Sequence, residues 1–303
     1  MIALLFAVAL ADTVVDYTPE DQTVYVHEWG VVTLSGEMFV GSVPETEILD
    51  PWETYEMEDK APVVYFYGVP FTGGQFTVEL NGGRFTDIFP LPEGASLDGE
   101  SVTWTISSTE QMSGTYVIPR EDLPAGGTSC GWELDSWRDG GALVLDFPDG
   151  TRDRFLYYEC AFPADPGAPP YPFRTGGGVD PDYDAPVLVF DLYAGEAARM
   201  AVCQASDAMN STLEWVPYTR SGAIEAVCGM AMGDLKSAEI EDLWDTWERY
   251  VTGGDWTGDR LMIFRLPYDL VEQLSTLNLE TSEGYRTQMT RFYLGMSPFS
   301  YTF

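Results

Sequence analysis

The chain has 303 residues, a hydrophobic fraction of 45% and a formal net charge of −34, from 49 acidic and 15 basic residues. The hydrophobic fraction is enough for a packed core. The negative charge repels phosphate backbones and anionic membrane surfaces and so disfavours binding to either, and we expect no nucleic-acid partner. The acids are spread along the whole chain. That distribution fits solubility at high salt, divalent-cation binding or a plain solvated surface.

Residues 1–11 resemble a secretory signal peptide. Ile2 to Leu10 is a short apolar run, and Ala9-Leu10-Ala11 is a small-x-small cleavage pattern before Asp12, although a positive n-region is missing. The run is shorter than the roughly 20 apolar residues that span a bilayer, and no later run reaches that length, so we expect no transmembrane segment. The pattern predicts a periplasmic or extracellular mature chain, and the alternative is an apolar first strand.

Residues 12–163 alternate between short apolar runs and turn residues such as Asn81-Gly82-Gly83 and Pro148-Asp149-Gly150. Many short strands at close spacing are typical of a sandwich or barrel, so we predict a β-sandwich-like domain. The expected strands cover residues 23–27, 31–35, 63–67, 75–80, 84–89, 101–107, 114–118, 142–147 and 153–159.

Residues 164–186 contain clustered prolines and a triple glycine, which predicts a linker. We expect residues 187–303 to form a smaller α+β domain, with strands at 187–193, 198–204, 212–216, 261–266 and 288–294 and a short helix opened by Pro267. One long amphipathic helix is predicted from Asp234 or Ser237 to Thr252. Its apolar residues recur at helical spacing and place one face on the core: Ile240, Leu243, Trp244, Trp247 and Val251. The predicted fold class is β-rich.

Four cysteines allow three disulfide connectivities. We predict Cys130–Cys160 and Cys203–Cys228, because each pair is local in sequence and could link neighbouring strands. Such bridges suit an exported protein, and the lack of a C-x-x-C motif argues against a redox site or a zinc knuckle.

The sharpest local feature is His27-Glu28-Trp29-Gly30, which contains the single histidine of the chain. A histidine can serve as a general base or metal ligand, so His27 and Glu28 are weak catalytic candidates. The competing interpretation is that His27 is buried and hydrogen-bonded, with Trp29 in the core and Gly30 permitting a β-bulge. No complete nucleophile motif, phosphate loop or dinucleotide fingerprint accompanies the histidine.

Asp180, Asp182 and Asp184 alternate along a predicted loop, and oxygen ligands in such a pattern suit calcium. They are weak metal candidates, because aspartates are common in solvated turns. Asp146, Asp149 and Asp153 are a second weak set around the predicted hairpin. Tryptophans could form a surface for stacking sugars, although they more often lie in cores: Trp52, Trp104, Trp132, Trp137 and Trp215.

Two stretches resemble a group of uncharacterised exported bacterial proteins. Val26-His27-Glu28-Trp29-Gly30 and Thr33 are similar to that group's V-H-E-W-G-T-F-T motif, and Pro62 to Tyr67 are similar to its T-P-V-x-Y-F-Y strand. Residues 238–247 and 261–267 are similar to its C-terminal helix and strand. The chain differs at Val31-Val32 and at Cys160. The resemblance implies export and a shared architecture, but no mechanism.

We therefore expect an exported cell-envelope or extracellular binding or structural protein, with an envelope protein or a glycan as partner. Two alternatives remain open. One is a hydrolase that uses His27 and Glu28 with acids from elsewhere, which requires an accessible histidine ring. The other is a calcium-stabilised, adhesion-type module.

Overall fold

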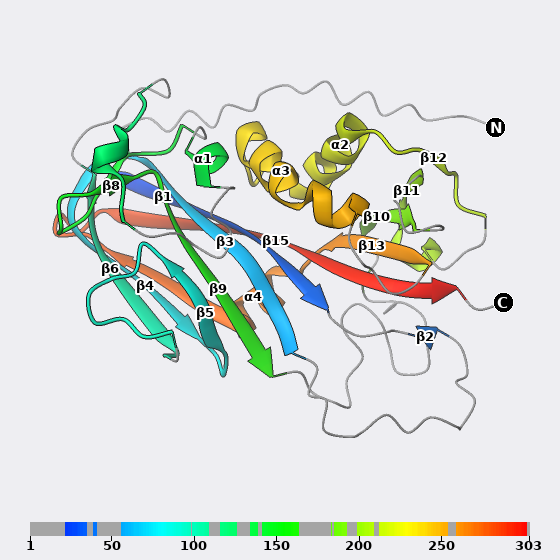
Figure 1. Cartoon of the computed structure of the whole chain (residues 1–303), viewed down its shortest axis with the longest axis horizontal. Coiled ribbons are helices and arrows are strands. Elements are labelled where there is room, and N and C mark those ends of the chain that lie inside the picture. Colours follow the sequence, from blue (N-terminus) through cyan, green and yellow to red (C-terminus); the bar gives the residue numbers. More distant parts are fainter. Residues whose placement is uncertain are drawn as a thin grey trace.

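The structure is a computed structural model, and it describes residues 22–34, 39–40, 56–97, 99–108, 116–125, 134–138, 141–163, 183, 185–192, 199–208, 212–253 and 259–301. Its described part is built from two β-sheets, with three of its four α-helices over the outer face of the larger sheet (Figure 1). The large sheet has the order β12-β11-β10-β13-β15-β1-β3-β9-β5, and β2 also pairs with β15. The small sheet has the order β14-β4-β6-β7-β8.

The strands of the large sheet are β1 (Thr23–Leu34), β2 (Phe39–Val40), β3 (Glu56–Gly68), β5 (Arg84–Phe89), β9 (Phe155–Pro163), β10 (Pro186–Asp191), β11 (Arg199–Gln204), β12 (Val216–Pro217), β13 (Arg260–Arg265) and β15 (Arg286–Tyr301). Those of the small sheet are β4 (Phe71–Leu80), β6 (Ser101–Ser108), β7 (Leu145–Asp146), β8 (Arg152–Asp153) and β14 (Ser275–Glu280). The α-helices are α1 (Leu134–Trp137), α2 (Arg220–Ala231), α3 (Ser237–Gly253) and α4 (Tyr268–Leu274).

Strand β1 lies in the middle of the large sheet. It runs parallel to β15 and antiparallel to β3, which places Glu28 opposite Arg291 and His27 opposite Tyr65. The register with β3 shifts between Trp29 and Val31. The predicted bulge at Gly30 is therefore confirmed, and the two strands expected at 23–27 and 31–35 form one continuous strand.

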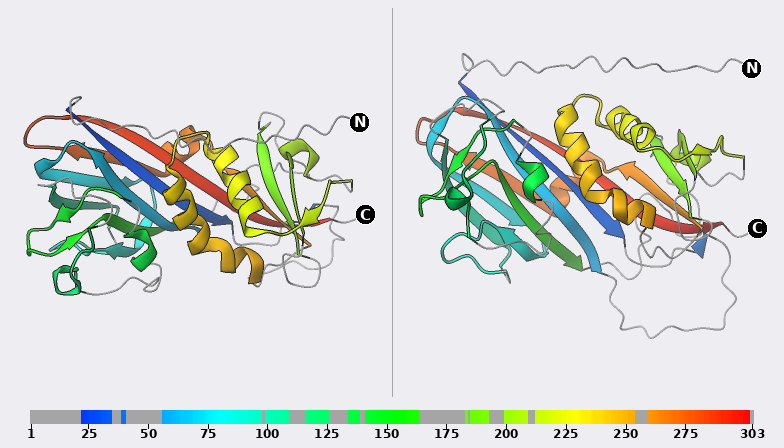
Figure 2. Two further views of the ribbon diagram at one scale, coloured as in Figure 1. Left: turned by 90° about the horizontal axis from the view of Figure 1, so that it is seen from above. Right: turned by 45° about the horizontal axis from the view of Figure 1, so that its top comes forward.

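The large sheet has a hydrophobic core on each face. One core packs it against the small sheet and α4, and includes Phe76, Trp104 and Tyr158. The other packs it against α2 and α3, and includes Trp29, Trp137 and Trp244. Figure 2 shows α2 and α3 lying across their face of the large sheet. Since both faces are covered, the central strands are apolar on both sides.

The β-rich fold class, with two sheets packed as in a sandwich and one long amphipathic helix, is confirmed. The five apolar residues expected on one face of that helix are all buried. The sequence analysis assigned no helix between residues 217 and 233, but Arg220–Ala231 form α2. Thr219 caps this helix by accepting a hydrogen bond from the Gly222 N–H.

Both predicted segments contribute to both sheets. In the large sheet, β1, β3 and β9 lie beside β10, β13 and β15 from the later segment, and β14 pairs with β4 in the small sheet. The described strands therefore form one layered unit, which corrects the expected division into residues 12–163 and 187–303. The clustered prolines and glycines of residues 164–186 predicted a boundary between two domains. Composition carries no information on which distant strands pair with one another, because that pairing depends on long-range packing. Residues 1–11 and most of residues 164–186 lie outside the described part.

Candidate functional site

The histidine motif supplies one polar side chain to each face of the large sheet. Successive strand residues point to opposite faces, so His27 faces the helices and Glu28 faces the small sheet. Both side chains are buried, with 4% of His27 and none of Glu28 exposed. The two side chains therefore do not meet in one site, and the hydrolase hypothesis that uses both of them stays a prediction.

On the helical face, His27 is bound to a carboxylate from α3. Its Nδ1 atom lies 3.1 and 3.0 Å from the two carboxylate oxygens of Glu239, which is fully buried. These distances are those of a hydrogen bond between the imidazole ring and the Glu239 side chain. This pair ties the central strand to the start of α3.

Glu239 also closes the N-terminus of the helix. Its Oε2 accepts a hydrogen bond of 2.7 Å from the backbone N–H of Lys236, the residue before the helix. A carboxylate in the first turn is further stabilised by the helix dipole. Of the two residues at which the helix was expected to begin, Ser237 is the first residue of α3, whereas Asp234 lies before it and pairs with Arg265.

Two tyrosines of β3, Tyr65 and Tyr67, lie on the same face of the sheet as His27. The ring of Tyr67 lies edge-on to His27 at 4.9 Å, and the Nζ of Lys236 lies 3.4 Å from the centre of the same ring. Tyr65 donates a hydrogen bond of 2.9 Å to the carbonyl of Trp137. Burial, followed by the charges of Asp242, Glu239 and Asp153, raises the pKa of Tyr65 well above its usual value. We call His27, Tyr67, Lys236 and Glu239 the helix-side cluster.

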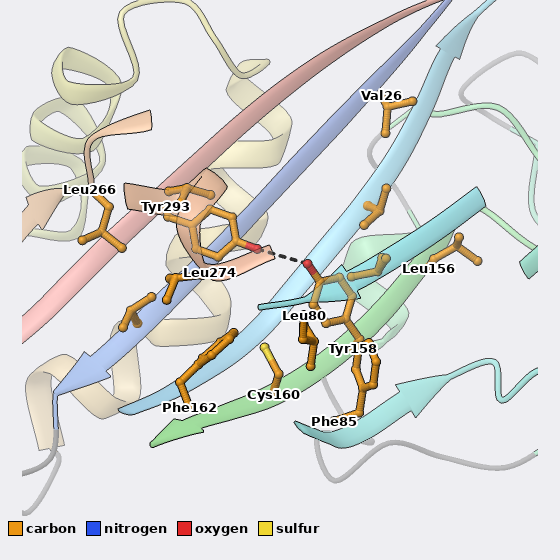
Figure 3. Packing of buried hydrophobic residues seen from close by; sticks show 14 of the residues in the cluster. Val26, Leu80, Phe85, Leu156, Tyr158, Cys160, Phe162, Leu266, Leu274 and Tyr293 are labelled. Carbon is orange, nitrogen blue, oxygen red and sulfur yellow. Dashed lines mark hydrogen bonds between the residues drawn. The ribbon is translucent and has the colours of Figure 1, made fainter. Parts of the chain in front are cut away.

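On the other face, Glu28 forms a buried ion pair with Arg291. The Nε of Arg291 donates a hydrogen bond of 2.5 Å to Glu28 Oε2, and the hydroxyl of Tyr158 donates one of 2.5 Å to Glu28 Oε1. The Tyr158 hydroxyl also lies 3.4 Å from that of Tyr293, and Figure 3 shows the two hydroxyls pointing toward one another in this core.

Arg291 continues the network to the small sheet and α4. It donates to the Glu272 carboxylate at 2.9 Å and to the carbonyl and hydroxyl of Ser275, each at 2.7 Å. Burial disfavours its cation, yet the charge of Glu28 and the nearby Tyr293 and Tyr158 raise the pKa of Arg291 above its ordinary value. The motif thus joins the large sheet to both neighbouring layers.

The expected disulfide Cys203–Cys228 is wrong, because both cysteines are free thiols. Cys203 packs against the core between the sheets, whereas Cys228 packs against the core beneath the helices. Thiols on opposite faces of a sheet cannot approach within bonding distance. Cys160 is buried on β9, and its expected partner Cys130 lies outside the described residues. That bridge stays a prediction.

The acidic candidates are only partly described. Asp180, Asp182 and Asp184 lie outside the described residues, so calcium binding there stays a prediction. Asp146 pairs with Arg152, Asp153 pairs with Arg138, and Asp149 accepts hydrogen bonds from Thr151 in its turn. Among the described residues, no group of three acidic, histidine or cysteine side chains could hold a metal ion.

The tryptophans do not form an exposed row in the described part of the chain. Trp104 and Trp137 are buried, Trp215 is half-buried, and Trp52 and Trp132 lie outside the described residues. Trp104 donates a hydrogen bond of 2.7 Å to the carbonyl of Pro90. This burial favours a core role over sugar stacking.

Sequence reasoning missed the partners of the motif. Glu239 is 212 residues from His27, and Arg291 is 263 residues from Glu28. The available signal for Glu239 was its position three residues after Lys236 at the start of a predicted helix. No comparable signal marks Arg291.

Comparison with known proteins gave no match to a family model, a curated protein or a solved structure. Separately, no helix in the described ranges has the length and apolar character needed to cross a membrane.

Proposed function

We propose that the chain is an exported binding or structural protein of the cell envelope or extracellular space, related to the uncharacterised group whose motif it shares. One observation carries this proposal. His27 and Glu28, the residues that could most readily have been catalytic, are both buried and hydrogen-bonded across the layers, to Glu239 and Arg291 respectively. On this account the motif stabilises the scaffold, and an envelope protein or a glycan binds elsewhere.

The hydrolase alternative is less well supported. Glu239 does supply the histidine with an acid from elsewhere in the chain. However, that hypothesis requires a histidine ring that a substrate can reach, and only 4% of His27 is exposed. The calcium-stabilised module rests on acids outside the described residues and is tested by the effect of EDTA on the melting temperature.

Export is tested by expressing the full chain with its own N-terminus and sequencing the protein from the periplasmic and extracellular fractions. The proposal predicts a mature chain that begins at Asp12. Uncleaved protein confined to the cytoplasm would refute export.

The binding role is tested by sedimenting the purified chain with isolated envelope fractions, using wild type and His27→Gln. The control variant is Arg286→Met, which changes an exposed residue of β15. We expect all three proteins to bind equally while they remain folded. Turnover of an ester, glycoside or peptide substrate that disappears in folded His27→Gln would establish the hydrolase instead.

A further inference from the structure

The turn between β4 and β5 contains the one Asn-Gly pair of the chain. Three asparagines occur, Asn81, Asn210 and Asn278, and glycine follows only Asn81. Asparagine is a thermolabile residue, because the backbone nitrogen of the next residue can attack its side-chain amide. A glycine at the next position has no side chain to obstruct that attack. The turn is therefore the candidate site for deamidation.

The structure leaves the reacting groups of this turn accessible. Asn81 and Gly82 are both exposed. Gly82 has a φ of +87°, and a Cβ built on it would meet no heavy atom within 4 Å beyond its chain neighbours. Among the described residues, the Gly82 N–H donates to no acceptor. The nitrogen that would attack is thus neither covered nor held by a competing hydrogen bond.

Asn81 also caps the C-terminus of α4. Its backbone N–H donates a hydrogen bond of 2.8 Å to the carbonyl of Leu274. Its Nδ2 donates to the carbonyls of Gln273 at 3.1 Å and Glu272 at 3.3 Å. Carbonyls in the last turn of a helix have no partner further along the helix, and the helix dipole makes this end negative, so a donor suits the position. The reaction requires these two exposed side-chain hydrogen bonds to open.

We propose that Asn81 is a self-modification site, and that its deamidation releases the turn between β4 and β5 from α4. The Gly82 nitrogen bonds to Cγ of Asn81 and loses its proton, and Nδ2 leaves as ammonia, which gives a succinimide ring. Water then adds to either ring carbonyl and opens the ring to aspartate or isoaspartate, so the step needs no oxidant or reductant.

The product cannot restore the cap. A carboxylate only accepts hydrogen bonds, and it would face the carbonyls at the negative end of α4. Release of the turn is therefore one-way. The inference does not depend on the proposed function, because it concerns this turn alone.

The first test is incubation of the folded wild-type chain at pH 8 in heavy-oxygen water. Digestion in ordinary water and mass mapping follow, so that only conversion during the incubation introduces heavy oxygen. The peptide that contains Asn278 is the internal reference, because this asparagine lies in β14 and is followed by Leu279. We expect Asn81 to take up heavy oxygen at least ~10-fold faster than Asn278, since only Gly82 lacks a side chain.

The second test uses Asn81→Asp, which reproduces one product of the reaction. The backbone N–H of residue 81 reports on its bond to Leu274 by hydrogen exchange. After correction for intrinsic rates, we expect this N–H to exchange about 10-fold faster in Asn81→Asp than in wild type, because the side-chain donor is lost and a negative charge opposes the helix end. Asn278→Asp is the matched control, since it makes the same change at an exposed position of β14 and should leave that exchange unchanged.

Two results would overturn the proposal. One is the absence of heavy oxygen at Asn81 in the folded chain under conditions that convert the chain unfolded in urea. The other is an exchange rate at residue 81 that is the same in Asn81→Asp and wild type.

Discussion

Replacing Arg291 by methionine removes the cation from the core between the sheets. Arg291 and Glu28 are each 3% exposed or less, and the arginine also holds Ser275 of β14 and Glu272 of α4. The change leaves the Glu28 carboxylate buried without its positive partner. Breaking a buried ion pair in this way typically costs about 3–5 kcal/mol, so we expect a loss of that size in the free energy of unfolding.

Urea unfolding at fixed salt measures this loss, and a double-mutant cycle assigns it to the ion pair. Glu28→Gln removes the buried charge, so Arg291→Met should cost about 2 kcal/mol less in the Glu28→Gln background. Arg286→Met, at an exposed position on the same strand, should change stability by less than about 0.5 kcal/mol. Equal effects of the two arginine substitutions, or additive effects in the cycle, would refute the reasoning.

Three further predictions follow from local structure. A Cβ at Gly30 would lie 2.7 Å from Cε1 of Tyr293, so Gly30→Ala should lower the unfolding free energy by about 1–3 kcal/mol; an unchanged urea midpoint would contradict the packing. Lys236 loses its proton at about pH 8 in the folded state and near pH 10.5 in the unfolded state. Between these pH values the unfolded state binds more protons, so the unfolding free energy of wild type should rise relative to that of Lys236→Met. A difference between the two proteins that stays flat or falls over this interval would contradict the prediction. Iodoacetamide should alkylate both Cys203 and Cys228 in urea without any reductant, because both are free thiols. In the native protein at pH 8, Cys203 should react slowly, because burial raises its pKa to about 11. If alkylation in urea required dithiothreitol, the two cysteines would be bridged.

Local patterns predicted the elements whose signals are short in range. The face of α3 follows from the spacing of Ile240, Leu243 and Trp247, and the bulge in β1 follows from Gly30. Helix α2 was missed because glycines and β-branched residues give it a weak helical pattern. Strand β14 was also missed, since it directly follows α4 with no turn residues between them.

The candidate site was predictable only in part. Burial of His27 is one of the two interpretations that the sequence supports, and it follows from a lone ring within an apolar strand. Its partner Glu239 was not predictable, because the contact joins distant parts of the chain. The same limit applies to the pairing of β1 with β15, which brings together the two ends of the described chain. Contacts of this kind depend on the global topology, which periodicity does not encode.

The central claim is that the histidine motif holds the layers together. Its most direct test is urea unfolding of wild type, His27→Ala, Glu239→Gln and the double variant in matched salt. We predict that His27→Ala lowers the unfolding free energy by about 2 kcal/mol or more, because it leaves a buried carboxylate without its partner. The double variant should lose less than the sum of the single losses. Unchanged or increased stability of His27→Ala would contradict the account and would indicate that the histidine serves a purpose other than folding.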